Sequence, residues 1–119
     1  MKTISQKQKR IILIIAFIFS ICVVITVIIG KSILKDKHVD EIEKVIASRG
    51  GIVVNVDVVN GMDSPFINEY SKNNNIYKIT YRISNNTYIA WYRGSNVINN
   101  IHEQNPGRGG GYPEKWIFE

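Results

Sequence analysis

The chain has 119 residues, a formal net charge of +5 and one cysteine. Residues 1–10 alone carry +4, while residues 31–119 hold seven Lys and four Arg against ten Asp and Glu, a net of +1. Because a domain that binds DNA or RNA needs its cations in the folded part, this near-neutral remainder argues against a nucleic-acid partner. The single cysteine, Cys22, also excludes a disulfide framework and a site built from several thiolates.

After the basic tail, residues 1–10, an uninterrupted apolar run begins. Ile11 to Ile29 reads IILIIAFIFSICVVITVII, 19 residues without a charge, a proline or a glycine. As a helix with about 1.5 Å rise per residue it spans roughly 28 Å, close to the ~30 Å hydrocarbon core of a bilayer. We therefore expect residues 11–30 to form a transmembrane helix, with the lipid bilayer as a partner.

Two other interpretations of this run fit the sequence less well. A cleaved secretory signal has a shorter apolar region, about 7–15 residues, followed by small residues at the cleavage site. A lipoprotein needs a small residue before the acylated cysteine, whereas Ile21 precedes Cys22. The pattern favours an uncleaved signal-anchor.

The cations that flank the run predict its orientation. Those before it are Lys2, Lys7, Lys9 and Arg10, and those after it are Lys31, Lys35 and Lys37. The side with more cations stays in the cytoplasm. We expect a single-pass protein of the cell membrane with the N-terminus in the cytoplasm and residues 31–119 outside.

The exterior part opens with a predicted helix at about 36–49. Val39, Ile42, Val45 and Ile46 fall on one helical face. The following Gly50-Gly51 supplies the positive φ that commonly ends a helix.

Strands are predicted at about 52–59, 76–84, 87–93 and 115–118. In the first, Ile52, Val54, Val56 and Val58 alternate with other residues and are expected on one face. The segments between the first two strands and before the last are rich in turn-forming Asn, Gly and Pro. We predict an α+β domain with one helix packed on a 3–4 stranded antiparallel sheet.

The middle strands form a predicted hairpin around Asn85-Asn86, since Asn tolerates the left-handed conformation of two-residue turns. This turn sets the expected register. Its opposed pairs are Ser84 with Thr87, Ile83 with Tyr88, Tyr81 with Ala90, Ile79 with Tyr92, Thr80 with Trp91 and Lys78 with Arg93.

Two directly opposed cations beside a Trp are unfavourable in a ladder and can mark a site. We hypothesise that Lys78, Arg82, Trp91 and Arg93 form a shallow surface for an anionic ligand, such as a cell-wall polymer, lipid headgroups or an acidic peptide. The alternative is an ordinary solvent-facing sheet surface, on which Asp57 neutralises a cation and an Arg stacks on the Trp.

No catalytic motif accompanies these elements. The Gly107 to Gly111 stretch lacks the Lys-Ser/Thr of a phosphate-binding loop. His38 and His102 have no Cys or carboxylate neighbours at metal-ligand spacing. We expect no catalytic residues, no metal or other cofactor, and no enzymatic activity.

Five segments of residues 31–119 carry a resemblance to small single-pass membrane proteins of low-GC Gram-positive bacteria. They are Gly50-Gly51, Asp63-Ser64-Pro65-Phe66, Ile76-Tyr77-Lys78-Ile79-Thr80-Tyr81, Ala90-Trp91-Tyr92-Arg93 and Lys115-Trp116-Ile117-Phe118. The resemblance implies a cell-membrane location and no particular chemistry. A helix laid on an antiparallel sheet also resembles cystatin-like folds, as a likeness of architecture alone.

The expected function is that of a membrane-anchored, non-catalytic extracytoplasmic domain that binds or modulates a cell-envelope partner. The alternative is a small immunity- or stress-type membrane protein that acts through its transmembrane span.

Overall fold

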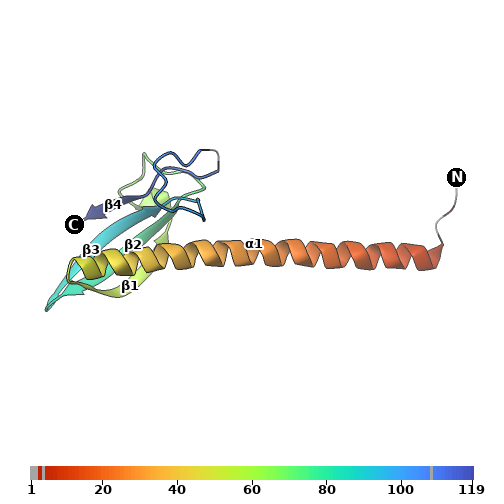
Figure 1. Ribbon diagram of the computed structural model, residues 1–119, viewed down its shortest axis with the longest axis horizontal. Coiled ribbons are helices and arrows are strands. Elements are labelled where there is room, and N and C mark those ends of the chain that lie inside the picture. The colour runs from red at the N-terminus through yellow and green to blue at the C-terminus, as the bar shows by residue number, and fades with distance from the viewer. Residues whose placement is uncertain (1–2, 4, 108) are drawn as a thin grey trace. The chain divides into compact units, whose positions relative to one another are not determined.

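A computed structural model of the chain describes residues 3, 5–107 and 109–119. The helix α1 (Gln6–Ser48) is followed by β1 (Ile52–Val59), a 3-10 turn η1 (Gly61–Asp63), β2 (Asn75–Ile83), β3 (Asn86–Gly94) and β4 (Lys115–Phe118) (Figure 1). The strands form one antiparallel sheet in the order β1-β2-β3-β4, which confirms the α+β class. The chain divides into two units, residues up to Ile33 and Leu34–Glu119.

The N-terminal unit contains the apolar part of α1. By length and composition α1 is able to cross a membrane, and none of its most apolar 18-residue window is buried within the chain. Thr26 Oγ1 donates to the Cys22 carbonyl at 2.8 Å, so this hydroxyl is satisfied by the preceding turn of the helix.

The helix is continuous where the sequence suggested two, one in the membrane and one at about 36–49. The junction contains no proline, and Gly30 lowers helix stability by only ~1 kcal/mol relative to Ala, which does not interrupt a long helix. The end lies close to the predicted position. Gly50 has φ +79°, its N–H donates to the Ala47 carbonyl, and the Gly51 N–H donates to the Ile46 carbonyl, the pattern of a Schellman cap.

Strand β1 contains a bulge at Val54. Val53 pairs with Tyr81 and Asn55 with Thr80, so Val54 is the extra residue. One extra residue reverses the alternation of faces. The single apolar face predicted for this strand is therefore wrong. Val53 and Val56 pack against the core, while Ile52, Val54 and Val58 are 67%, 57% and 56% exposed.

The β2–β3 hairpin turns at Ser84-Asn85, two residues out of the predicted register. Ile83 pairs with Asn86, and Ser84 takes the positive φ of +54°. The observed register places Tyr81 opposite Tyr88 and Tyr77 opposite Tyr92, and the rings of both pairs stack. Such aromatic cross-strand pairs stabilise a hairpin. A shift of two residues keeps every side chain on its predicted face and changes only its partner.

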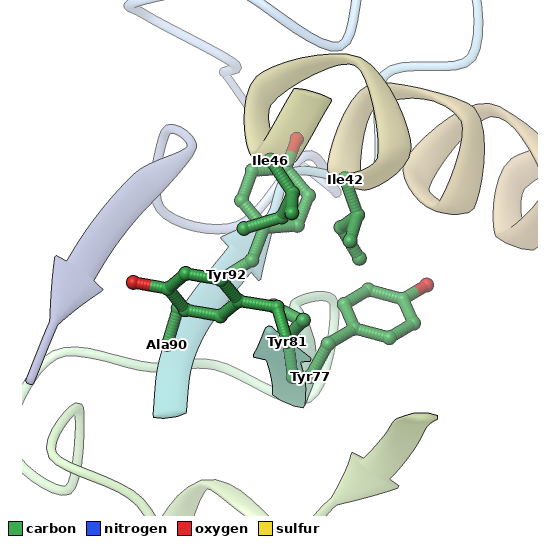
Figure 2. Packing of buried hydrophobic residues seen from close by; sticks show 7 residues of the cluster. Ile42, Ile46, Tyr77, Tyr81, Ala90 and Tyr92 are labelled. Atoms are coloured by element: carbon green, nitrogen blue, oxygen red, sulfur yellow. The ribbon is translucent and has the colours of Figure 1, made fainter. Parts of the chain in front are cut away.

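Both faces of the sheet carry buried apolar residues. On one face, Ile42 and Ile46 of α1 extend toward the tyrosines of β2 and β3 (Figure 2). The whole cluster is Ile42, Ile46, Tyr77, Ile79, Tyr81, Ala90 and Tyr92. On the other face, Phe66 from the β1–β2 loop packs with Ile76 and Trp91. That loop therefore covers part of the face on which the sequence placed a ligand surface.

Candidate functional site

Trp91 belongs to the second apolar cluster and is only 9% exposed. Its Nε1–H donates to Glu119 Oε1 at 3.1 Å. The indole ring thus packs within the chain, and its one polar atom is already hydrogen-bonded to Glu119. Both observations favour a packing role.

Arg93 is 4% exposed, and its guanidinium joins segments that flank the sheet. Nη1 donates to the Glu69 carbonyl at 2.7 Å, and Nε donates to the Pro113 carbonyl at 2.9 Å. The Glu69 carboxylate lies 3.6 Å from Nη1. Burial lowers the pKa of Arg93 and Glu69 opposes this change, so the group remains charged. Arg93 holds the β1–β2 loop to the segment before β4.

The other two residues of the predicted surface are more accessible. Lys78 is opposite Trp91 and not Arg93, so the predicted opposition of two cations is wrong. The Lys78 Nζ lies 5.6 Å from the Trp91 ring centroid, and Asp57 pairs with Lys78 on the β1 side. Arg82 is exposed, opposite Thr87. An anionic ligand on this face stays a prediction, with Lys78 and Arg82 as the accessible cations.

His38 is completely buried between α1 and the sheet. Its Nε2 lies 2.9 Å from the Ser95 carbonyl, and its Nδ1 lies 2.8 Å from the Tyr77 hydroxyl. Because a carbonyl only accepts, Nε2 carries the proton and the Tyr77 hydroxyl donates to Nδ1. Burial raises the pKa of Tyr77 to about 12, which keeps that hydroxyl protonated. The neutral imidazole is fully satisfied, which indicates a structural role.

Burial lowers the pKa of His38 from 6.5, against smaller opposing effects of the Ser95 carbonyl and Glu114. Besides Glu114, the titratable groups packed against the ring are Tyr77 and Tyr92. The unfolded chain binds a proton near pH 6.5 and the folded chain only at lower pH. The contribution of His38 to the free energy of unfolding is therefore expected to be fully present above pH 6.5. It should decrease as the pH falls below 6.5, by at most about 1.4 kcal/mol per pH unit.

Urea unfolding of the full chain in detergent micelles, followed by Trp fluorescence at several pH values, checks this expectation. His38→Gln should flatten the dependence between neutral pH and about pH 5, where most carboxylates stay charged. Glu43→Gln, which changes an exposed side chain on the same helix, is the control and should retain it. An unchanged slope in His38→Gln would refute the assignment.

A second cluster brings together Glu41 of α1, His102 of the β3–β4 loop and Glu114, which precedes β4. One donor atom from each lies within 4.8 Å of the others. His102 Nε2 is 3.5 Å from Glu41 Oε2, and His102 Nδ1 contacts Glu114 Oε1. We refer to these three residues as the His102 triad. The two histidines that are isolated in the sequence are thus both surrounded by polar partners in space.

A shallow groove of about 300 Å³ adjoins the triad. Glu41 and His102 line it together with Lys37, Asp40, Lys44 and residues 98–101. Lys37 Nζ donates to the Ile98 carbonyl and so holds the β3–β4 loop against α1.

No sequence signal pointed to this triad, because its members are 61 and 12 residues apart along the chain. Arg93 and its partner Glu69 are similarly distant. Comparisons of the chain with protein-family models, curated proteins and solved structures give no match. The function is therefore inferred from the sequence and the geometry of this chain.

Proposed function

We propose that the chain is a membrane-anchored, non-catalytic domain outside the cell membrane that binds or modulates a protein of the cell envelope. The apolar side chains from Ile11 to Ile29 are exposed along α1, which suits contact with lipid. The excess of cations before this segment favours a cytoplasmic N-terminus.

The partner is proposed to bind at the open edge of the sheet, which is β1. β1 has one strand neighbour, β2, and β4 lies at the opposite edge. Along its eight residues Ile52, Val54 and Val58 are more than half exposed. An edge strand with free backbone groups and apolar side chains accepts an extended segment from a partner as an additional strand. A segment with apolar residues at alternate positions fits this edge.

The interior supports a non-catalytic role. Within the described residues every buried side-chain nitrogen or oxygen has a hydrogen-bond partner. His38 and Arg93, the buried basic groups, are both engaged by carbonyl groups of the chain. Polar groups satisfied in this way stabilise a scaffold and are poorly placed to act on a substrate.

Cysteine crosslinking in intact cells tests the proposal. In a Cys22→Ser background, Val54→Cys is expected to form a reproducible adduct with one envelope protein when treated with a membrane-impermeant crosslinker. Ile67→Cys is the matched control, because Ile67 is 53% exposed but lies outside β1, and it should react with the reagent without forming that adduct. A charge at the edge, Val58→Lys, should decrease the yield of the Val54→Cys adduct.

Three outcomes contradict the proposal. If neither cysteine reacts in intact cells, residues 34–119 are not outside. If the same adducts form from position 67, β1 is not the binding edge. If the adduct has twice the mass of the chain, the edge pairs with a second copy and not with another protein.

A role carried by the membrane span is the second candidate, because none of its apolar window is buried within the chain and its side chains are free to contact a partner in the bilayer. An unrelated transmembrane sequence in place of residues 11–30 separates the two. The adduct at Val54→Cys should persist if residues 34–119 carry the binding, and it should disappear if the span selects the partner.

A further inference from the structure

We propose that the His102 triad is a binding site for a divalent transition-metal cation of the zinc class. Glu41, His102 and Glu114 come from three separate segments and place one donor atom each within 4.8 Å of the others. Two carboxylates and one imidazole are a ligand set that binds zinc and neighbouring first-row metals, usually with a further position left for water. Nothing in the membrane-anchoring role requires these three residues to meet.

The spacing of the donors is close to what one ion needs. Zinc bonds to nitrogen and oxygen are about 2.0–2.2 Å long, so tetrahedral ligand atoms lie roughly 3.4 Å apart. His102 Nε2 and Glu41 Oε2 are 3.5 Å apart. His102 Nδ1 already touches Glu114 Oε1. The two carboxylates face different nitrogens of the ring, so binding of one ion requires the imidazole, whose side chain is 52% exposed, to rotate until one nitrogen faces both carboxylates.

The carboxylates are held in place before any ion binds. The side chains of Glu41 and Glu114 are only 15% and 16% exposed. Tyr92 is completely buried, and its hydroxyl donates to Glu114 Oε2 at 2.7 Å, which leaves Oε1 directed at His102. Such hydrogen bonds to ligand atoms are a regular feature of metal sites because they orient the ligands.

The segment that leads into His102 is anchored by two hydrogen bonds. The Ser95 hydroxyl donates to the Ile101 carbonyl at 3.1 Å, and Ile101 is buried. The His102 backbone N–H donates to Asn100 Oδ1 at 3.1 Å. The imidazole therefore samples a restricted region near the two carboxylates, which lowers the entropy cost of binding an ion.

Electrostatics favour a cation at this position. Among the ion pairs described in residues 3, 5–107 and 109–119, Glu41 pairs with His102 alone. Lys37 and Lys44 line the adjoining groove, but both are exposed and Asp40 offsets part of their charge. Two largely buried carboxylates converge on one imidazole here, and the two charges of a divalent ion compensate both carboxylates more completely than a single positive charge does.

Zinc titration of the full, untagged chain in detergent micelles after chelator treatment tests the site. By isothermal titration calorimetry at neutral pH we expect one zinc ion per chain, with an affinity that falls as the pH is lowered because protons compete for the ligands. His102→Gln and Glu41→Gln should each weaken binding at least tenfold. Glu43→Gln is the matched control, an exposed carboxylate on the same helix, and should bind as the original chain does.

Cobalt as a spectroscopic probe gives a second readout that does not depend on stability. Visible d–d absorption typical of low coordination is expected in the original chain and in Glu43→Gln, and it should be lost in His102→Gln. Trp fluorescence of each variant checks that it is folded.

The proposal is overturned if zinc does not bind at millimolar concentration, or if binding survives His102→Gln and Glu41→Gln. If His102→Gln destabilises the chain while the original shows no response to zinc, the proposal is also overturned, and the triad is a structural contact between α1 and the segment before β4. The zinc and cobalt measurements do not depend on whether β1 binds an envelope protein.

Discussion

Replacement of Ile42 by Ala is expected to lower the free energy of unfolding of residues 34–119 by roughly 2 to 5 kcal/mol. Ile42 is completely buried in the cluster that joins α1 to β2 and β3 (Figure 2). Removal of its Cγ1, Cγ2 and Cδ1 atoms leaves a cavity in a close-packed cluster, which relaxes only in part. Because a small domain is stable by only about 5–15 kcal/mol, this loss is a large share of the total.

Urea unfolding of the full chain in micelles, followed by Trp fluorescence, measures the change, since Trp116 packs against the same cluster and Trp91 lies on the other face of the same sheet. Lys44→Ala is the matched control on the exposed side of the helix and should change the free energy of unfolding by less than about 0.5 kcal/mol. Equal effects of the two substitutions would show that α1 does not pack on the sheet through Ile42.

Gly94→Ala is expected to destabilise the same unit by roughly 2 to 4 kcal/mol. A Cβ at position 94 would lie 2.5 Å from His38 Cε1 and 2.6 Å from Nε2. No real contact is this short, so the imidazole has to move. Its hydrogen bonds to the Tyr77 hydroxyl and the Ser95 carbonyl are then stretched or broken in the interior, where water does not replace them.

A double-mutant cycle with His38→Ala isolates this contact. The smaller residue at position 38 makes room for the new Cβ, so the combined variant should lose less stability than the two single losses together. Gly30→Ala is the control glycine, because it lies in α1 with nothing within 4 Å of the added carbon. Strict additivity of Gly94→Ala and His38→Ala would mean that the glycine is required for another reason.

Elements that depend on neighbours along the chain could be predicted from the sequence. The apolar run from Ile11 to Ile29 is helical because each helical hydrogen bond joins residues four apart. Gly50 ends that helix as expected, since a residue without a Cβ adopts a positive φ at no steric cost. The antiparallel sheet could be predicted from the alternation of apolar residues along the strands and from the turn-forming residues between them.

Two details of the sheet depend on contacts between strands that the sequence alone does not reveal. The bulge at Val54 depends on how β1 meets Tyr81 and Thr80, and the turn at Ser84-Asn85 depends on the pairing of tyrosines across the hairpin. Both are decided by packing between strands, so one Asn-rich turn was compatible with more than one register.

The candidate site also shows which features the sequence predicts and which only the fold decides. From the sequence alone, Trp91 and Arg93 belong to a sheet face that could be open to a ligand, because nothing in the order of residues says that Phe66 and Glu69 cover it. Likewise the two carboxylates beside His102 in the fold, Glu41 and Glu114, are 61 and 12 residues from it along the chain. The sequence by itself determined the long apolar helical segment, the net charge and the α+β class, since these follow from local propensity and composition. Only the tertiary structure decided which polar groups are buried, paired or brought together, because such contacts join residues tens of positions apart and depend on the fold as a whole.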